Sequence, residues 1–153
     1  MRSIYDNVTI KPSVGPVSRS SLDASAVPGT VVDTKGFNTG MIVLIRNSAG
    51  ASSIAEYATS VATLYEGAKS DGSDMAIALD NRGSAIAAQV TTTDSQTVGL
   101  ARIEGLGTTR KRYLQIRESS SWSGSNSRAR VVVAEIALGR AFSNPANTTA
   151  SNT

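Results

Sequence analysis

A regular succession of short β-type runs, separated by turn-forming residues, is the feature that most constrains the fold of this chain. Runs of strand length occupy residues 75–79, 85–91 and 97–103. The turn sequences Asp80-Asn81-Arg82-Gly83 and Thr93-Asp94-Ser95 lie between them. Successive turns are about 10–12 residues apart, a spacing typical of antiparallel sandwiches and barrels. The sequence therefore predicts an all-β antiparallel fold, a β-sandwich or a barrel, of which we favour the antiparallel β-sandwich.

Two longer runs near the C-terminal end alternate between two faces. In residues 112–118, Leu114 and Ile116 share one face. In residues 130–139 the inward row consists of Val132, Ala134, Ile136 and Leu138. Because successive side chains of a strand point to opposite faces, both runs predict strands with one face on the core. The Ser/Gly-rich residues 119–127, which contain the only Trp, are interpreted as the loop between them.

An earlier part of the chain carries a more apolar strand pattern. Residues 30–34 form a short β-type run, and Lys35-Gly36 is a turn signal before a strand over residues 37–46. The middle of that strand, Met41-Ile-Val-Leu-Ile45, is apolar at every position. Since both of its faces are apolar, we expect this strand to lie inside a sheet.

Residues 50–69 permit two interpretations. Ile54, Ala58, Val61 and Tyr65 follow the spacing of a helical stripe. Thr59, Ser60 and Thr63 disfavour a helix, and the segment ends in the tight-turn sequence Ser70-Asp71-Gly72-Ser73. We favour a loop to about residue 59 followed by a strand, and a helix is the alternative.

The two ends of the chain differ from its middle. Pro12, Pro16 and Pro28 interrupt the first 29 residues, which favours an extended arm or an edge segment over a central strand. The tail over residues 143–153 has no apolar side chain larger than Ala or Pro. The sequence therefore predicts an N-terminal arm over 1–29, a β-sandwich over 30–142 and a polar tail over 143–153. Neither end can order itself, so we expect both to lie along neighbouring molecules.

Catalytic and metal chemistry have little support in this sequence. The chain has no Cys and no His, so the usual ligands of zinc, copper, haem and iron–sulfur clusters are missing. Ser120, Ser121 and Ser123 have no His as a general base. Nothing in the spacing brings Glu104 and Glu118 together as an acid–base pair. We expect no enzyme activity, no cofactor and no small-molecule substrate.

Membrane insertion is not expected either. The N-terminus lacks the apolar stretch of a signal peptide. The longest apolar run, residues 41–45, is far shorter than the roughly 20 residues that cross a bilayer.

Positive charge gathers in the C-terminal third. Residues 101–153 carry 8 basic and 3 acidic side chains, against 7 and 9 in residues 1–100. The densest run is Arg110-Lys111-Arg112, at the start of a predicted strand, which marks an edge of the domain. Its partner could be solvent, a neighbouring subunit or nucleic acid. The seven aromatic residues are not interleaved with the basic ones, so nucleic acid is the less favoured partner.

Four short segments resemble small virion proteins of tailed bacteriophages. They are Val31-Val-Asp33-Thr-Lys-Gly36-Phe37, Leu64-Tyr-Glu-Gly-Ala-Lys-Ser-Asp71-Gly72-Ser73, Thr109-Arg-Lys-Arg-Tyr113-Leu114-Gln-Ile116-Arg, and the final Val-rich run ending in Ala-Leu-Gly139-Arg. The similarity covers about residues 30–142. It is to capsid decoration (cement) or minor head proteins, which implies a jelly-roll type of β-sandwich.

The resemblance implies a structural role on the capsid surface of a virion assembled in the host cytoplasm. The expected partners are the major capsid protein, whose neighbouring subunits the chain would bridge, and two further copies in a homotrimer. A tail or head–tail connector component is the first alternative, and a nucleic-acid-binding β-barrel is the second. The interface residues we expect are Ile4, Tyr5, Val8, Ile10, Arg110, Lys111, Arg112, Trp122 and Phe142.

Overall fold

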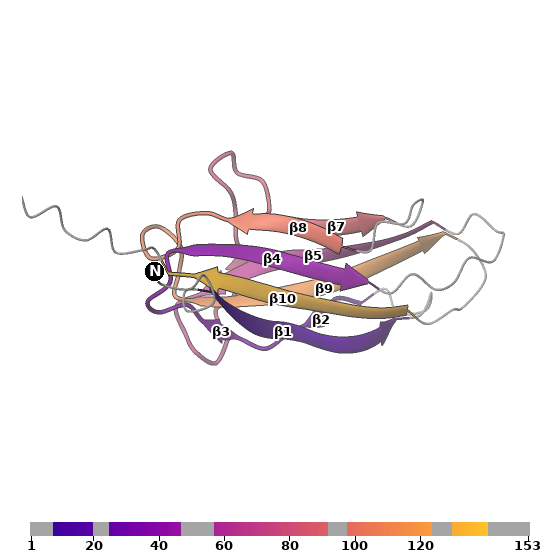
Figure 1. Cartoon of the computed structure of the whole chain (residues 1–153), viewed down its shortest axis with the longest axis horizontal. Coiled ribbons are helices and arrows are strands. Elements are labelled where there is room, and N and C mark those ends of the chain that lie inside the picture. The colour runs from indigo at the N-terminus through magenta and orange to yellow at the C-terminus, as the bar shows by residue number, and fades with distance from the viewer. Residues whose placement is uncertain (1–7, 20–24, 47–56, 92–97, 124–129, 141–153) are drawn as a thin grey trace, which may run out of the picture.

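The chain folds into two antiparallel β-sheets that face each other (Figure 1). The computed structural model describes residues 8–19, 25–46, 57–91, 98–123 and 130–140. Ten strands and no helix occur in these ranges, which confirms the all-β antiparallel sandwich expected from the turn spacing. Within them no helix is long and apolar enough to cross a membrane.

One sheet has four strands and the other has six. The four-stranded sheet has the order β1 (Val8–Arg19), β10 (Arg130–Gly139), β4 (Thr39–Arg46) and β8 (Val98–Ile103). In the six-stranded sheet, β9 (Tyr113–Ser123) and β5 (Tyr57–Gly67) pair with each other in the centre. The short strands β2 (Val27–Pro28) and β3 (Val32–Asp33) pair with β9, and β6 (Ala76–Ile77) and β7 (Ala87–Thr91) pair with β5.

Strand pairing follows a nested order along the chain. The first strand β1 pairs with the last strand β10, and the next two, β2 and β3, pair with β9. Inside these, β4 pairs with β8, and β5 pairs with β6 and β7. Most of this pairing therefore joins residues that are far apart in the sequence.

The core lies between the inner faces of the two sheets. The inward row of β10 is buried as its alternation predicts, and so are Leu114 and Ile116 of β9. Ile42 and Leu44 of β4 and Leu64 of β5 face them from the neighbouring strands. Burying these branched side chains supplies the main driving force for folding, about 1.5–3 kcal/mol for each side chain.

The two sheets also meet along their long sides. On one side Ser13 of β1 bonds to both neighbours: its carbonyl oxygen accepts from the Thr30 amide at 2.7 Å, and its Oγ accepts from the Ile116 amide at 3.0 Å. A side chain at Gly29 would lie 2.5 Å from the Ser13 carbonyl oxygen. On the other side, a side chain at Gly99 of β8 would lie 2.5 Å from the Gln89 carbonyl oxygen of β7. Glycine is required where the backbones come this close.

The boundary placed between an arm and the sandwich at residue 30 is wrong for β1. Residues 8–19 form an edge strand of the sandwich, and Val14 is only 2% exposed in the core. The register shifts at two points, between Pro12 and Val14 and between Val14 and Val17. Proline is tolerated there because an edge strand pairs on one side only and bulges release donors from the ladder.

Residues 57–67 and 119–123 both lie in long strands of the six-stranded sheet. The strand favoured after about residue 59 is confirmed and the helix alternative is wrong for these residues, since β5 begins at Tyr57 and pairs with β9 over its whole length. Residues 47–56 lie outside the described ranges. The predicted loop over residues 119–127 is wrong in its first part, because β9 continues to Ser123. A buried hydrogen bond between Ser60 Oγ and Ser120 Oγ, 3.1 Å apart, helps to explain why serines remain in this strand.

Candidate protein-interaction surface

The outward-pointing side of the four-stranded sheet, here called the outer face, is mainly apolar. Most of the large hydrophobic side chains that remain exposed in the described residues lie on it. They are Val8 and Ile10 of β1, Met41 and Ile45 of β4, Val98 and Leu100 of β8, and Val131 of β10. Contiguous exposed apolar surface of this kind marks a site of interaction with another molecule.

The sequence of β4 explains the continuity of the outer face. In Met41-Ile-Val-Leu-Ile45 the even-numbered side chains fill the core, so the odd-numbered ones point outward. Register then aligns Ile45 with Val133 of β10 and with Val98 of β8. One row of the outer face, Val133, Ile45 and Val98, is therefore apolar across all three strands.

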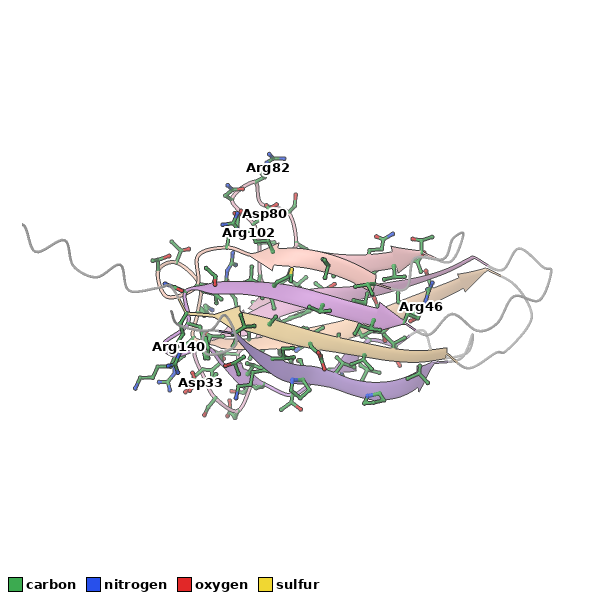
Figure 2. The ribbon with its side chains drawn as sticks, viewed as in Figure 1. Asp33, Arg46, Asp80, Arg82, Arg102 and Arg140 are labelled. Atoms are coloured by element: carbon green, nitrogen blue, oxygen red, sulfur yellow. The ribbon has the colours of Figure 1, made fainter. Side chains whose placement is uncertain are left out.

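Only two charged side chains occupy outward positions on β10, β4 and β8. Glu135 of β10 lies beside Val43 of β4, and Arg102 of β8 lies beside Met41 of β4. Figure 2 shows Arg102 at the end of β8, near the projecting hairpin that carries Asp80 and Arg82. Neither Glu135 nor Arg102 has an ion-pair partner within the described part of the chain. The outer face therefore carries one negative and one positive charge.

Arg110, predicted as an interface residue, is instead a fixed structural side chain. It is 9% exposed, and its Nη2 donates to the Leu79 carbonyl oxygen at 2.8 Å. Its Nε donates to the Glu104 carbonyl oxygen at 3.1 Å, and its Nη1 lies 3.4 Å from Glu66 Oε1. These contacts tie the hairpin around residues 78–86 to the end of the sandwich.

Arg112 of the same basic run forms an ion pair with Asp33 of the neighbouring strand β3. Its Nη2 lies 2.6 Å from Asp33 Oδ2, and its Nε donates to Asp33 Oδ1 at 2.8 Å. The bidentate bonds to Arg112, together with the Lys35 amide, lower the pKa of Asp33 to about 2. Between these two arginines, Lys111 is exposed. Two of the three cations in the run thus have carboxylate partners inside the chain.

The remaining predicted interface residues fall into two groups. Val8 and Ile10 are exposed on the outer face. Trp122 belongs to β9 and pairs with Ala58, but its side chain lies outside the described atoms. Ile4, Tyr5 and Phe142 lie outside the described residues.

Sequence reasoning missed most of the outer face. The apolar alternation of β4 was interpreted as burial on both sides, whereas only its Ile42 side is buried. The signal was present in Val131 and Val133, which alternate with the inward row of β10 and would be polar on a solvated sheet. A strand that is apolar on both faces needs a cover on its second face, either another layer of the same chain or a partner molecule. The sequence pattern alone does not distinguish between these two covers.

A polar group of side chains also lies inside the sandwich. Glu118 is fully buried, and Ser120 Oγ donates to its Oε1 at 2.5 Å. Arg46 of β4 is also buried, and its Nη1 donates to the Val90 carbonyl oxygen of β7 at 3.4 Å. Glu104 is exposed, so the structure does not unite it with Glu118. No group of three or more acidic side chains suited to a metal ion occurs in the described residues.

An open groove lies beside the hairpin around residues 78–86. Its volume is about 590 Å³, and it is lined by Ile77, Leu79 and Arg110 among others. The backbone and side chain of Arg110 form one wall, so the groove follows from the way the hairpin is attached.

Neither a protein-family model nor a curated protein matches this sequence.

Proposed function

We propose that this chain is a structural protein of a tailed-bacteriophage virion that decorates the capsid and stabilises it by bridging neighbouring major capsid subunits. The observation that carries the proposal is the apolar outer face of the four-stranded sheet. The class of particle comes from the resemblance of residues 30–142 to virion proteins.

The outer face supports a role within an assembly for a physical reason. Each exposed Val, Ile, Leu or Met side chain is stabilised by leaving water, at about 25 cal/mol for each Å² of apolar surface. A protein that functions alone keeps such surface scattered, because contiguous patches promote association. A permanent subunit of a particle instead covers them with its neighbours.

The strand order supports a jelly-roll assignment. A jelly roll is a double-sheet sandwich of eight strands in which Greek-key connections wrap the chain. The four nested pairings of this chain, β1 with β10, β2 and β3 with β9, β4 with β8, and β5 with β6 and β7, fit this wrapping. Jelly rolls occur in viral capsid and lectin domains, so the topology is compatible with a virion role and does not require it.

Decoration strengthens a shell by adding protein–protein contact across the joints between its subunits. A specific contact of standard size buries about 1,600 Å² in total. We assign shell contact to the terminal residues 1–7 and 141–153, which include Ile4, Tyr5 and Phe142. The homotrimer implied by the resemblance stays a prediction, and the basic run is a weak candidate for shell contact because Arg110 and Arg112 are paired.

Co-sedimentation with empty shells of the source phage tests the proposal. Full-length protein is expected to sediment with the shells to saturation, in a fixed ratio to the major capsid protein. A variant lacking residues 1–7 and 141–153 should bind at least about tenfold more weakly, which corresponds to about 1.4 kcal/mol. Full-length protein that stays in the supernatant would contradict the proposal.

A tail or connector component is the alternative that the outer face fits equally well. The number of copies in each virion separates the two, because a decoration protein occurs in many copies, in proportion to the subunits of the shell. Nucleic-acid binding is less supported, since Arg110 and Arg112 already have Glu66 and Asp33 as partners. DNA binding that weakens steeply with salt would favour it.

A further inference from the structure

We propose that the outer face is a self-association surface, on which two copies of this chain pack sheet against sheet around a two-fold axis. This inference rests on the proposed assembly role and names the partner of the outer face. The partner is a second copy of the chain, which the charges, the composition and the area of the outer face support.

The two charges of the outer face are arranged in a self-complementary way. Glu135 on β10 and Arg102 on β8 flank the central strand β4 on opposite sides. Glu135 is level with Val43, and Arg102 is level with the next outward residue, Met41. The midpoint between them therefore lies on β4, between Val43 and Met41.

A two-fold axis through that midpoint, running close to the direction of β4, exchanges the two flanking strands. Each β10 then faces the β8 of the other copy, and each Glu135 comes within reach of the other copy's Arg102. Face-to-face sheets cross at about 30°, and long side chains span the remaining offset. The two-fold symmetry gives two equivalent ion pairs, each between Glu135 of one copy and Arg102 of the other, as an isologous interface requires.

Composition also favours a second copy over an unrelated chain. Apart from Glu135 and Arg102, the outward positions of β4, β8 and β10 carry Val, Ile, Leu, Met, Ala, Gly and Thr side chains. Interfaces of homodimers are more apolar than those of transient complexes, at about 65% of the area. Apolar rows on β8 would pack against apolar rows on β10.

The area of the outer face fits a weak pair. Strands lie about 4.8 Å apart and rise about 3.4 Å per residue, so β10, β4 and β8, which face each other across the axis, present a face of the order of 400 Å². Two such faces bury on the order of 800 Å² in total, the size of a weak, transient interface. We therefore expect a micromolar dimer rather than a permanent one.

Sedimentation equilibrium of the full chain, across roughly 1–100 μM, measures the association directly. We expect a reversible monomer–dimer equilibrium. Leu100→Asp places a carboxylate in the apolar centre and should leave a monomer. Leu79→Asp is the matched control, because Leu79 is 48% exposed and Leu100 58%, and Leu79 lies on the hairpin beyond the outer face. The control should associate as the unchanged chain does.

Charge exchange gives a second test that does not depend on a disruptive substitution. Glu135→Arg places two arginines together, and Arg102→Glu places two glutamates together, so each should raise the dissociation constant at least about tenfold. The double variant restores opposite charges and should return to within about threefold of the original value. Circular dichroism spectra should show that all variants keep the sandwich.

The outcomes separate this inference from the proposed function. A chain that remains monomeric, a mass of three chains, or a double variant as weak as its single variants would overturn the two-fold pair. A mass of three chains would instead agree with the homotrimer implied by the resemblance. Shell binding uses the terminal segments and is measured on particles, so it can succeed where dimer formation fails.

Discussion

Ser13 shows how a single side chain can hold three distant segments together. Its Oγ donates to the Thr30 carbonyl oxygen at 2.9 Å and accepts from the Ile116 amide at 3.0 Å, while its carbonyl oxygen receives the Thr30 amide. The side chain is buried, so water cannot replace these bonds. A buried amide without an acceptor destabilises a protein by about 1–3 kcal/mol.

Ser13→Ala should therefore lower the free energy of unfolding by about 1–3 kcal/mol, because the Ile116 amide loses its acceptor. Urea denaturation followed by circular dichroism measures the change. Ser84→Ala is the control: Ser84 is exposed in the hairpin, and its substitution should change stability by less than about 0.5 kcal/mol. Equal effects of the two substitutions would show that Ser13 does not join the segments.

The ion pair between Asp33 and Arg112 makes part of the stability depend on pH. The pKa of Asp33 is about 2 in the folded chain, below its ordinary value of 3.8, mainly because Arg112 donates to the carboxylate. Since the folded pKa is the lower one, the carboxylate stabilises the fold above about pH 3.8. That stabilisation is lost as the pH falls from about 3.8 to about 2.

Asp33→Asn should thus lower the melting temperature at pH 7 and have a much smaller effect near pH 2. Because both side chains are about half exposed, the difference at pH 7 should be modest. Thermal melts of both proteins across this range provide the measurement. Glu104→Gln removes an exposed carboxylate with no ion-pair partner in the described residues, and at pH 7 it should lower the melting temperature by less than Asp33→Asn does.

At the scale of elements, the hairpin around residues 78–86 depends on Arg110. The hairpin makes its own turn, in which Asp80 Oδ1 accepts from the amides of Arg82 and Ser84 at 2.9 and 2.8 Å. Its base is paired with β5, since the Ala78 amide donates to the Leu64 carbonyl oxygen and the Leu64 amide donates to the Ile86 carbonyl oxygen, each at 2.9 Å. Arg110 adds a side-chain bond to the Leu79 carbonyl oxygen of the hairpin. The turn and the attachment are therefore separable.

Arg110→Ala should loosen the hairpin without unfolding the sandwich. Removing the side chain breaks the bonds to Leu79 and Glu104, which we expect to lower global stability by about 1–3 kcal/mol. Amide hydrogen exchange in residues 77–86 should increase by more than exchange in β9. Arg82→Ala, at the exposed tip of the same hairpin, is the control and should leave exchange unchanged. Uniformly faster exchange after Arg110→Ala would contradict local attachment.

The strands that alternate clearly were the ones the sequence could predict. β9 has one apolar row, and Glu135 interrupts the outward row of β10, so the inward residues of both strands followed from period two alone. For β1 the prolines and glycine left an extended arm and an edge segment both open, and the arm was chosen. Only the pairing with β10, with its bulges near Val14, makes this segment an edge strand. Pairing between residues more than 100 positions apart leaves no local signal.

The interaction surface was predictable only in part, because its contacts also join residues that are far apart in the sequence. Arg110 and Arg112 stood out as a dense basic run, but their partners Glu66 and Asp33 approach only in the folded chain. The outer face gathers single outward residues from four strands, and each looks unremarkable in its own segment. Its continuity depends on strand order, which alternation does not specify.

At the scale of the whole molecule, β1 decides where the folded unit begins. It covers one side of β10 along nine paired positions, and Val14 completes the core. Its loss would expose the backbone of β10 as a free edge, which is prone to pair with other chains. Two truncations that differ by only 12 residues, one that keeps β1 and one that lacks it, should therefore behave very differently.

A chain that begins at residue 8 should keep its unfolding midpoint, whereas one that begins at residue 20 should be insoluble or unfold with a far lower midpoint. The second truncation removes the core contact of Val14 and the Ser13 bonds to Thr30 and Ile116, which together join the two sheets. Solubility after expression and thermal melts of the two chains measure the contrast. If the chain that begins at residue 20 melts as the full chain does, β1 would be a detachable arm, as its proline content alone suggests. The shell-binding role would then extend to all of the residues before Ser20.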